Sequence, residues 1–123
     1  MTMTQPLEHR AFDHDDEVRE GPNWRADLVD LVGGVQVGRL TLQPGWRWSA
    51  DVKPVAGTDL CMAPHQQYQV SGRIHVAMAD GTELEVGPGE VVSLPAGHDA
   101  WVIGDEPVVA IDWQGASVWA RHD

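Results

Sequence analysis

Apolar and polar residues alternate with a period of two along most of the chain from Trp24 onward. This period places successive side chains on opposite faces of a β-strand, whereas an amphipathic helix repeats about every 3.6 residues. No stretch of a dozen residues carries a helical stripe. The pattern therefore predicts strands over 24–31, 35–42, 67–70, 74–78, 84–86, 91–94, 101–103 and 108–113.

Glycine and proline pairs punctuate these strands at nearly even spacing. They fall at Gly33-Gly34, Pro44-Gly45, Asp80-Gly81, 87–89 and 95–97, and the Asp-Gly pair is typical of a hairpin turn. Short strands between such turns predict an all-β sandwich or barrel. We assign residues 24–123 to this barrel domain.

Residues 1–23 differ from the rest because they are charged and carry no sustained apolar period. We predict an irregular, extended N-terminal arm that pairs with the barrel edge or with a partner chain.

The charge composition limits which kinds of partner the chain can bind. Nineteen acidic residues against eight Lys and Arg give a formal net charge of −11, which repels phosphate groups. We expect no nucleic acid partner and no membrane partner, and the longest apolar runs are too short to span a bilayer. The single cysteine, Cys61, excludes an internal disulfide, and the N-terminus lacks a secretory pattern. A cytoplasmic location is expected.

Two motifs carry a family resemblance. Gly89 stands six residues before Pro95-Ala96-Gly97, and His65 stands seven residues before Gly72. With this spacing, the segment 44–113 resembles the cupin superfamily. It is also similar to a group of short single-domain bacterial cupins, whose usual features match Pro44 to Ser49, Gly57-Thr58-Asp59, Cys61 with His65, Tyr68 with Ser71-Gly72-Arg73, and Pro95 to Pro107. The resemblance implies a double-stranded β-helix (jelly-roll) barrel with an interior pocket, and pairing into a homodimer.

The chain departs from the general cupin pattern at two places. The usual His-x-His pair is missing: counting from Gly45 puts Asp51 and Lys53 in its slots, and counting back from His65 puts Asp59 and Cys61 there. Both alignments stay open. Ala100 occupies the usual histidine slot of the second motif, and His98 lies two residues earlier, on the same strand face.

Cys61, His65 and His98 are the candidate metal ligands. A thiolate with two imidazoles favours zinc, copper or nickel over magnesium or calcium. The expected cofactor is one divalent transition metal ion, whether zinc, iron, nickel, copper or manganese, with Asp59, Asp51 or an open position as the fourth ligand. In the alternative, Cys61 is a small buried apolar residue and the two histidines are hydrogen-bonded without metal.

Residues after His65 supply the candidate substrate pocket. If His65 points inward, the period of two turns Gln67 and Gln69 inward too, where amides orient a small polar ligand. A shifted register would instead turn Tyr68 inward and the glutamines to water. Trp101 is a further pocket candidate, as an aromatic wall, although the tryptophans favour core packing.

These residues lead to two functional hypotheses. The first is a small metal-dependent cupin enzyme that acts on a small polar organic molecule by dioxygenase, decarboxylase, isomerase or lyase chemistry. Asp51, Lys53 or Asp59 would then transfer protons. The second is a non-catalytic cupin module that binds a small ligand. A third role, dimerisation through the N-terminal arm, is compatible with both.

Overall fold

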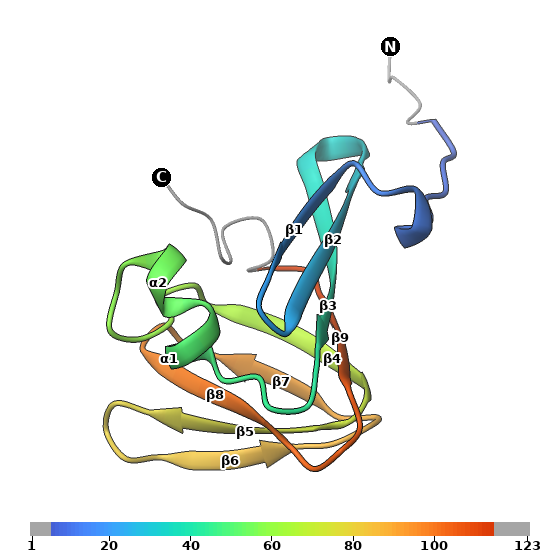
Figure 1. Ribbon diagram of the computed structural model, residues 1–123. Helices are drawn as coiled ribbons and strands as arrows, with labels where there is room; N and C mark the ends of the chain where they lie inside the picture. The colour runs from blue at the N-terminus through green and yellow to red at the C-terminus, as the bar shows by residue number, and fades with distance from the viewer. Residues whose placement is uncertain (1–5, 115–123) are drawn as a thin grey trace.

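Two antiparallel sheets enclose the interior of the molecule (Figure 1). The computed structural model describes residues 6–114. The larger sheet has the order β1-β2-β3-β9-β4-β7 and the smaller one the order β6-β5-β8. The strands are β1 (Glu17–Gly21), β2 (Trp24–Leu31), β3 (Val35–Leu42), β4 (His65–Ser71), β5 (Arg73–Met78), β6 (Glu83–Val86), β7 (Val91–Leu94), β8 (His98–Ile103) and β9 (Val108–Asp112). The predicted all-β barrel is confirmed.

The strand boundaries follow the sequence pattern closely where the alternation is long. β2, β3 and β7 coincide with the predicted strands, whereas β4 and β8 each begin earlier, at His65 and His98. Both early starts lie next to proline- and glycine-containing segments, where the alternation cannot yet be recognised. The two histidines are therefore the first residues of regular strands.

Residues 6–114 also form four short helical segments: η1 (Phe12–His14) before the first strand, and η2 (Val32–Gly34), α1 (Trp48–Asp51) and α2 (Lys53–Ala56) between strands. Pro54 stands in the first turn of α2, where its missing N–H costs no hydrogen bond, and Gly57 ends the helix at φ +75°. Both α-helices lie at one end of the barrel, and α1 contacts β8 (Figure 1). Within residues 6–114, no helix is long and apolar enough to cross a membrane.

The N-terminal segment contributes an edge strand. We predicted an irregular arm that pairs with the barrel edge or with a partner chain. β1 pairs with β2, in the register Glu17 to Leu28 through Gly21 to Trp24. Residues 17–21 are thus a regular strand. The pattern did not predict it because four of its five residues are exposed, so neither face shows an apolar period. The residues before β1 are held against β2 by Arg10, which donates to the Asp16 carboxylate and to the Asp30 carbonyl oxygen.

The core lies between the inward faces of the two sheets. Trp46 and Trp48 are 3% and 2% exposed, so they pack in the core as predicted, whereas Trp113 is 42% exposed. Each fully buried Val or Leu side chain of this core contributes about 1.5–3 kcal/mol. One polar group is buried elsewhere: Asp27 is 1% exposed, on the face of β2 opposite Ala26, and accepts from the Arg25 and Arg39 guanidinium groups.

One glycine fixes the turn from β4 into β5. Gly72 has φ +71°, and a Cβ there would lie 2.8 Å from Val108 Cα and closer still to the Pro107 carbonyl. Only glycine allows this close approach, because any Cβ would meet backbone atoms. The turn therefore holds the end of β4 close to the start of β9.

Candidate metal centre

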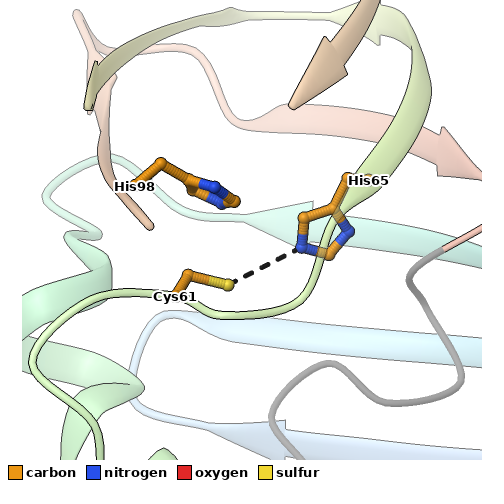
Figure 2. A group of neighbouring side chains, drawn as sticks. All are labelled: Cys61, His65 and His98. Carbon is orange, nitrogen blue, oxygen red and sulfur yellow. Dashed lines mark hydrogen bonds between the residues drawn. The ribbon is translucent and has the colours of Figure 1, made fainter. Parts of the chain in front are cut away.

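Three buried side chains point into one space inside the barrel (Figure 2). Cys61 comes from the loop between α2 and β4, His65 from the first residue of β4 and His98 from the first residue of β8. One ligand atom from each residue lies within 4.8 Å of the others, and Cys61 Sγ is 3.7 Å from His65 Nε2. The predicted ligand set is brought together, although it comes from three separate segments.

Backbone hydrogen bonds hold the Cys61 loop against β8. The Cys61 N–H donates to the His98 carbonyl oxygen at 2.8 Å, and the Gly97 N–H donates to the Cys61 carbonyl oxygen at 2.7 Å. Pro64 restricts the residue before it to extended conformations, which carries the chain from this bridge into β4. The position of the thiol is thus set by the same strand that carries His98.

The partners of the two histidines determine which nitrogen faces the cavity. The His65 Nδ1–H donates to the Asp112 carboxylate, and the His98 Nδ1–H donates to the Pro95 carbonyl oxygen at 2.8 Å. Both partners are acceptors, so Nδ1 carries the proton in each ring and Nε2 keeps its lone pair. A carboxylate or a carbonyl behind each imidazole is the usual arrangement for metal-bound histidines.

Asp112 is a site residue that we did not predict. It is fully buried on β9, in phase with Val108 and Ala110, and it also accepts from Gln67 Nε2 at 3.3 Å and from the Gln114 N–H at 2.9 Å. The signal was present in the sequence, because an aspartate at an inward position of an otherwise apolar strand needs a buried partner. Sequence reasoning could not say that this partner was His65, which lies 47 residues away.

A small cavity opens beside the two histidines. Its volume is about 30 Å³, and its lining residues are Leu40, Leu42, Trp46, Trp48, His65, Gln67, Gln69, Ile74, Leu94, His98, Ala100, Val108 and Ala110. Gln67 and Gln69 are 8% and 1% exposed, so the inward register of β4 is the one that places the glutamines in the interior. His98 shares the inward face of β8 with Ala100, as the two-residue spacing predicted.

The residues predicted to transfer protons do not reach this cavity. Asp51 accepts from the Arg47 N–H at 3.1 Å, and Lys53 forms a surface ion pair with Asp59, whose side chain is 99% exposed. The reason lies in the local fold, because the missing His-x-His slots fall on α1, α2 and the following loop instead of on an inward-facing strand. Neither Asp51 nor Asp59 is positioned as a fourth ligand.

Two predicted pocket residues face away from the cavity. The prediction for Tyr68 is wrong, because the residue alternates with the inward glutamines and is 41% exposed on the outer face of β4. The prediction for Trp101 is wrong for the same reason. Its ring stacks on His75 at 4.5 Å and lies under Arg47 at 4.3 Å, outside the cavity lining.

Burial sets the protonation of the metal-free site. It raises the pKa of the Cys61 thiol to about 11 and lowers the pKa of His98. Both effects favour the neutral form, so a thiol proton must leave when a metal ion binds. One thiolate and two imidazoles with free Nε2 lone pairs fit a divalent transition metal ion and leave a further coordination position open.

Comparison with known proteins supports the fold. No protein-family model and no curated protein sequence matches the chain. Among solved structures, a Rhizobium leguminosarum protein of unknown function has a TM-score of 0.62 and 18% identity, over 89% of this chain and 99% of that one. Ectoine synthase from P. lautus has a TM-score of 0.62 and 10% identity, over 89% of this chain and 79% of that one. Bacillus subtilis oxalate decarboxylase, which has Mn(II) centres, has a TM-score of 0.58 and 21% identity, over 92% of this chain and 30% of that one.

These neighbours establish the fold. Ectoine synthase and oxalate decarboxylase are cupin-fold proteins, so the chain has the cupin fold that its motifs predicted. The low sequence identities show the fold alone. Any activity must be argued from the residues that line the cavity.

Proposed function

We propose that this protein is a small metal-dependent cupin enzyme, which holds one divalent transition metal ion on Cys61, His65 and His98 and acts on a small polar organic molecule. The observation that carries the proposal is the convergence of three buried ligand atoms within 4.8 Å. Both histidines present Nε2 because an acceptor fixes the proton on Nδ1. Cupin-fold neighbours that are metal enzymes lend support.

Each residue has a distinct part in the proposed site. Asp112 holds the His65 ring and increases the basicity of its Nε2, and the backbone bridge between Cys61 and His98 keeps two ligands in register. Gln67 and Gln69 face the substrate side of the cavity. A bound ion would act as a Lewis acid towards a substrate oxygen or would activate a bound water.

The donor set limits the identity of the metal. Thiolate and imidazole ligands suit zinc, iron, nickel and copper better than manganese, which prefers oxygen ligands. Oxalate decarboxylase has Mn(II) centres, but that property belongs to the neighbour. We propose zinc, iron, nickel or copper here, ahead of manganese.

A non-catalytic ligand-binding module is the second candidate. One observation favours it: no carboxylate and no lysine from the described part of the chain lines the cavity, so among those lining residues the histidines alone could move a proton. The two functions differ in turnover, because a binding module returns its ligand unchanged. Mass spectrometry of a ligand after incubation with the metal-loaded protein separates them.

A metal-free nucleophilic thiol fits the site less well. Cys61, His65 and Asp112 form a thiol–imidazole–carboxylate chain, which is typical of cysteine hydrolases. However, Cys61 is 3% exposed, and burial raises the pKa of its thiol to about 11. Its own N–H already donates to the His98 carbonyl oxygen and cannot stabilise an oxyanion.

Elemental analysis of the protein, purified without a nickel column, tests the metal site. We expect about one equivalent of a transition metal in the native protein and less than about a tenth in His65→Ala. His75→Ala is the matched control, because His75 lies on the outer face of β5, where it pairs with Glu83 at 2.8 Å. If the native protein also contains less than about a tenth of an equivalent and its melting temperature is unchanged in chelator, the metal proposal is wrong.

A further inference from the structure

The amide of Gln69 has a fixed orientation. Its Nε2 donates to the carbonyl oxygens of Ser71 and Gly72, at 3.3 and 3.1 Å. Because carbonyls only accept, both N–H groups must face them, and Oε1 is left as an acceptor. No residue among 6–114 donates to this oxygen, although the side chain is 1% exposed and lines the cavity.

Gln67, two residues earlier on the inward face of β4, has its amide oriented in a similar way. Its Nε2 donates to the Asp112 carboxylate at 3.3 Å, which fixes the NH2 group on that side. Its Oε1 likewise receives no donor from the part of the chain that the structure describes. Both amides line the cavity, and an amide oxygen that borders an interior cavity normally receives a donor from a bound molecule or a water. A bound molecule with O–H or N–H groups would satisfy both.

The charge of the site disfavours an anionic ligand. Among residues 6–114, no lysine and no arginine line the cavity. A divalent ion would already be balanced by the Cys61 thiolate and the Asp112 carboxylate, so an anionic ligand would find no excess positive charge. Burying an unpaired carboxylate there costs several kcal/mol more than burying a neutral amide or hydroxyl. A dianion such as oxalate is therefore disfavoured.

We infer that the ligand is a small neutral molecule with a metal-binding oxygen at one end and a hydroxyl or amide N–H donor at the other, and this inference rests on the proposed function. His65, Gln67 and Gln69 occupy successive inward positions on β4, about 6.6 Å apart. The metal would lie at the His65 end, and the two amide oxygens lie further along the strand. The cavity is small, about 30 Å³, which favours a ligand of few non-hydrogen atoms.

Glycolamide and glycolate form a matched pair of probes. They have the same size and the same hydroxyl group, but glycolamide is neutral and ends in N–H donors, whereas glycolate is an anion and ends in acceptors. Isothermal titration of the metal-loaded protein should give a Kd at least about tenfold lower for glycolamide, the effect of one or two hydrogen bonds to buried acceptors. Equal or tighter binding of glycolate would overturn the inference, as would no binding of either probe at about 50 mM.

Variants assign the preference to the glutamines. Gln67→Leu and Gln69→Leu remove the acceptor oxygens, and each should reduce the glycolamide preference about fivefold or more. Gln66→Leu is the control, because Gln66 directly precedes Gln67 and lies on the exposed face of β4. The two glutamines donate to different partners, so failure of one variant to fold leaves the other as the test. An unchanged preference in a folded variant would contradict the inference.

Metal content separates this inference from the proposed function. A protein that holds about one equivalent of metal and yet prefers glycolate keeps the metal site and loses the neutral-ligand inference. A protein without metal that still prefers glycolamide through Gln67 and Gln69 loses the proposed metal chemistry and keeps the recognition by the amide oxygens.

Discussion

Replacing Asp112 by asparagine exchanges one buried oxygen for an NH2 group and leaves the side-chain volume almost unchanged. The orientation of the new amide follows from its neighbours. The Gln114 N–H is a backbone donor to Asp112 Oδ1 at 2.9 Å, whereas Gln67 Nε2 is a longer, rotatable donor to Oδ2 at 3.3 Å. We therefore expect the asparagine oxygen to stay on the Gln114 side, its NH2 group to face His65, and the Gln67 amide to turn away. An NH2 group donates to Nδ1, which moves the imidazole proton to Nε2, the atom that faces Cys61.

The magnitude follows from this tautomer change. Hydrogen-bond partners of metal-bound histidines typically contribute a factor of about 10–100 to metal affinity, or about 1.4–2.7 kcal/mol. We expect Asp112→Asn to lie at the upper end of this range, because it both removes a buried carboxylate partner and protonates the ligand atom. His65 is 2% exposed, so no solvent water can replace the lost acceptor cheaply.

Chelator competition measures the affinity, and ¹⁵N NMR of the histidine rings reports the tautomer. Asp27→Asn is the matched control, since Asp27 is equally buried but pairs with Arg25 and Arg39 on β2 and β3. The control should lose stability and keep its metal affinity. The reasoning is refuted if Asp112→Asn binds metal within about twofold of the native protein while His65 stays protonated at Nδ1.

Three further predictions concern backbone, charge and thiol. Gly72→Ala should lower the free energy of unfolding, measured in urea, by more than about 2 kcal/mol, because it combines a left-handed φ with a backbone clash. Gly81→Ala is the control: its φ is +90° but its surroundings are open, so the free energy of unfolding should fall by only about 1 kcal/mol. The hydrogen bond from Arg10 lowers the pKa of Asp16, so its stabilisation is present above the ordinary value of 3.8 and is lost as pH falls through the lower folded-state value. Hydrogen exchange of residues 8–16 should rise there, and Asp16→Asn should show the raised exchange already at neutral pH. Because burial raises the pKa of Cys61 to about 11, apparent metal affinity should increase about tenfold per pH unit between about pH 7 and 9; a flat profile would mean that the thiol is not a ligand.

Much of the barrel could be predicted because its inward positions repeat. Long alternating segments such as 24–31 and 35–42 have one apolar face, and the core against which they pack preserves the register. Residues 17–21 could not be predicted in this way, because an exposed edge strand is stabilised by backbone hydrogen bonds to β2 and needs no apolar face. The two short helices after Trp46 could not be predicted either, because four residues are too few to show a helical period.

The site was predictable as far as it depended on strand faces. His65, Gln67 and Gln69 follow from one alternating strand, and His98 follows from its two-residue distance to Ala100. Contacts between distant segments were not predictable, such as the one between Asp112 and His65. Asp51 and Lys53 were misleading for the opposite reason: their spacing matched a motif, but the local chain folds into helices and turns them outward.

The bridge between Cys61 and His98 has a kinetic consequence. All three ligand residues are at most 3% exposed, so an ion can leave only when part of the barrel opens. The loop between α2 and β4 should open at the lowest free energy, because an isolated bridge joins it to β8 by only a few backbone hydrogen bonds. The lifetime of the bound metal would then be set by the opening rate of this loop, and could be long even where the equilibrium affinity is modest.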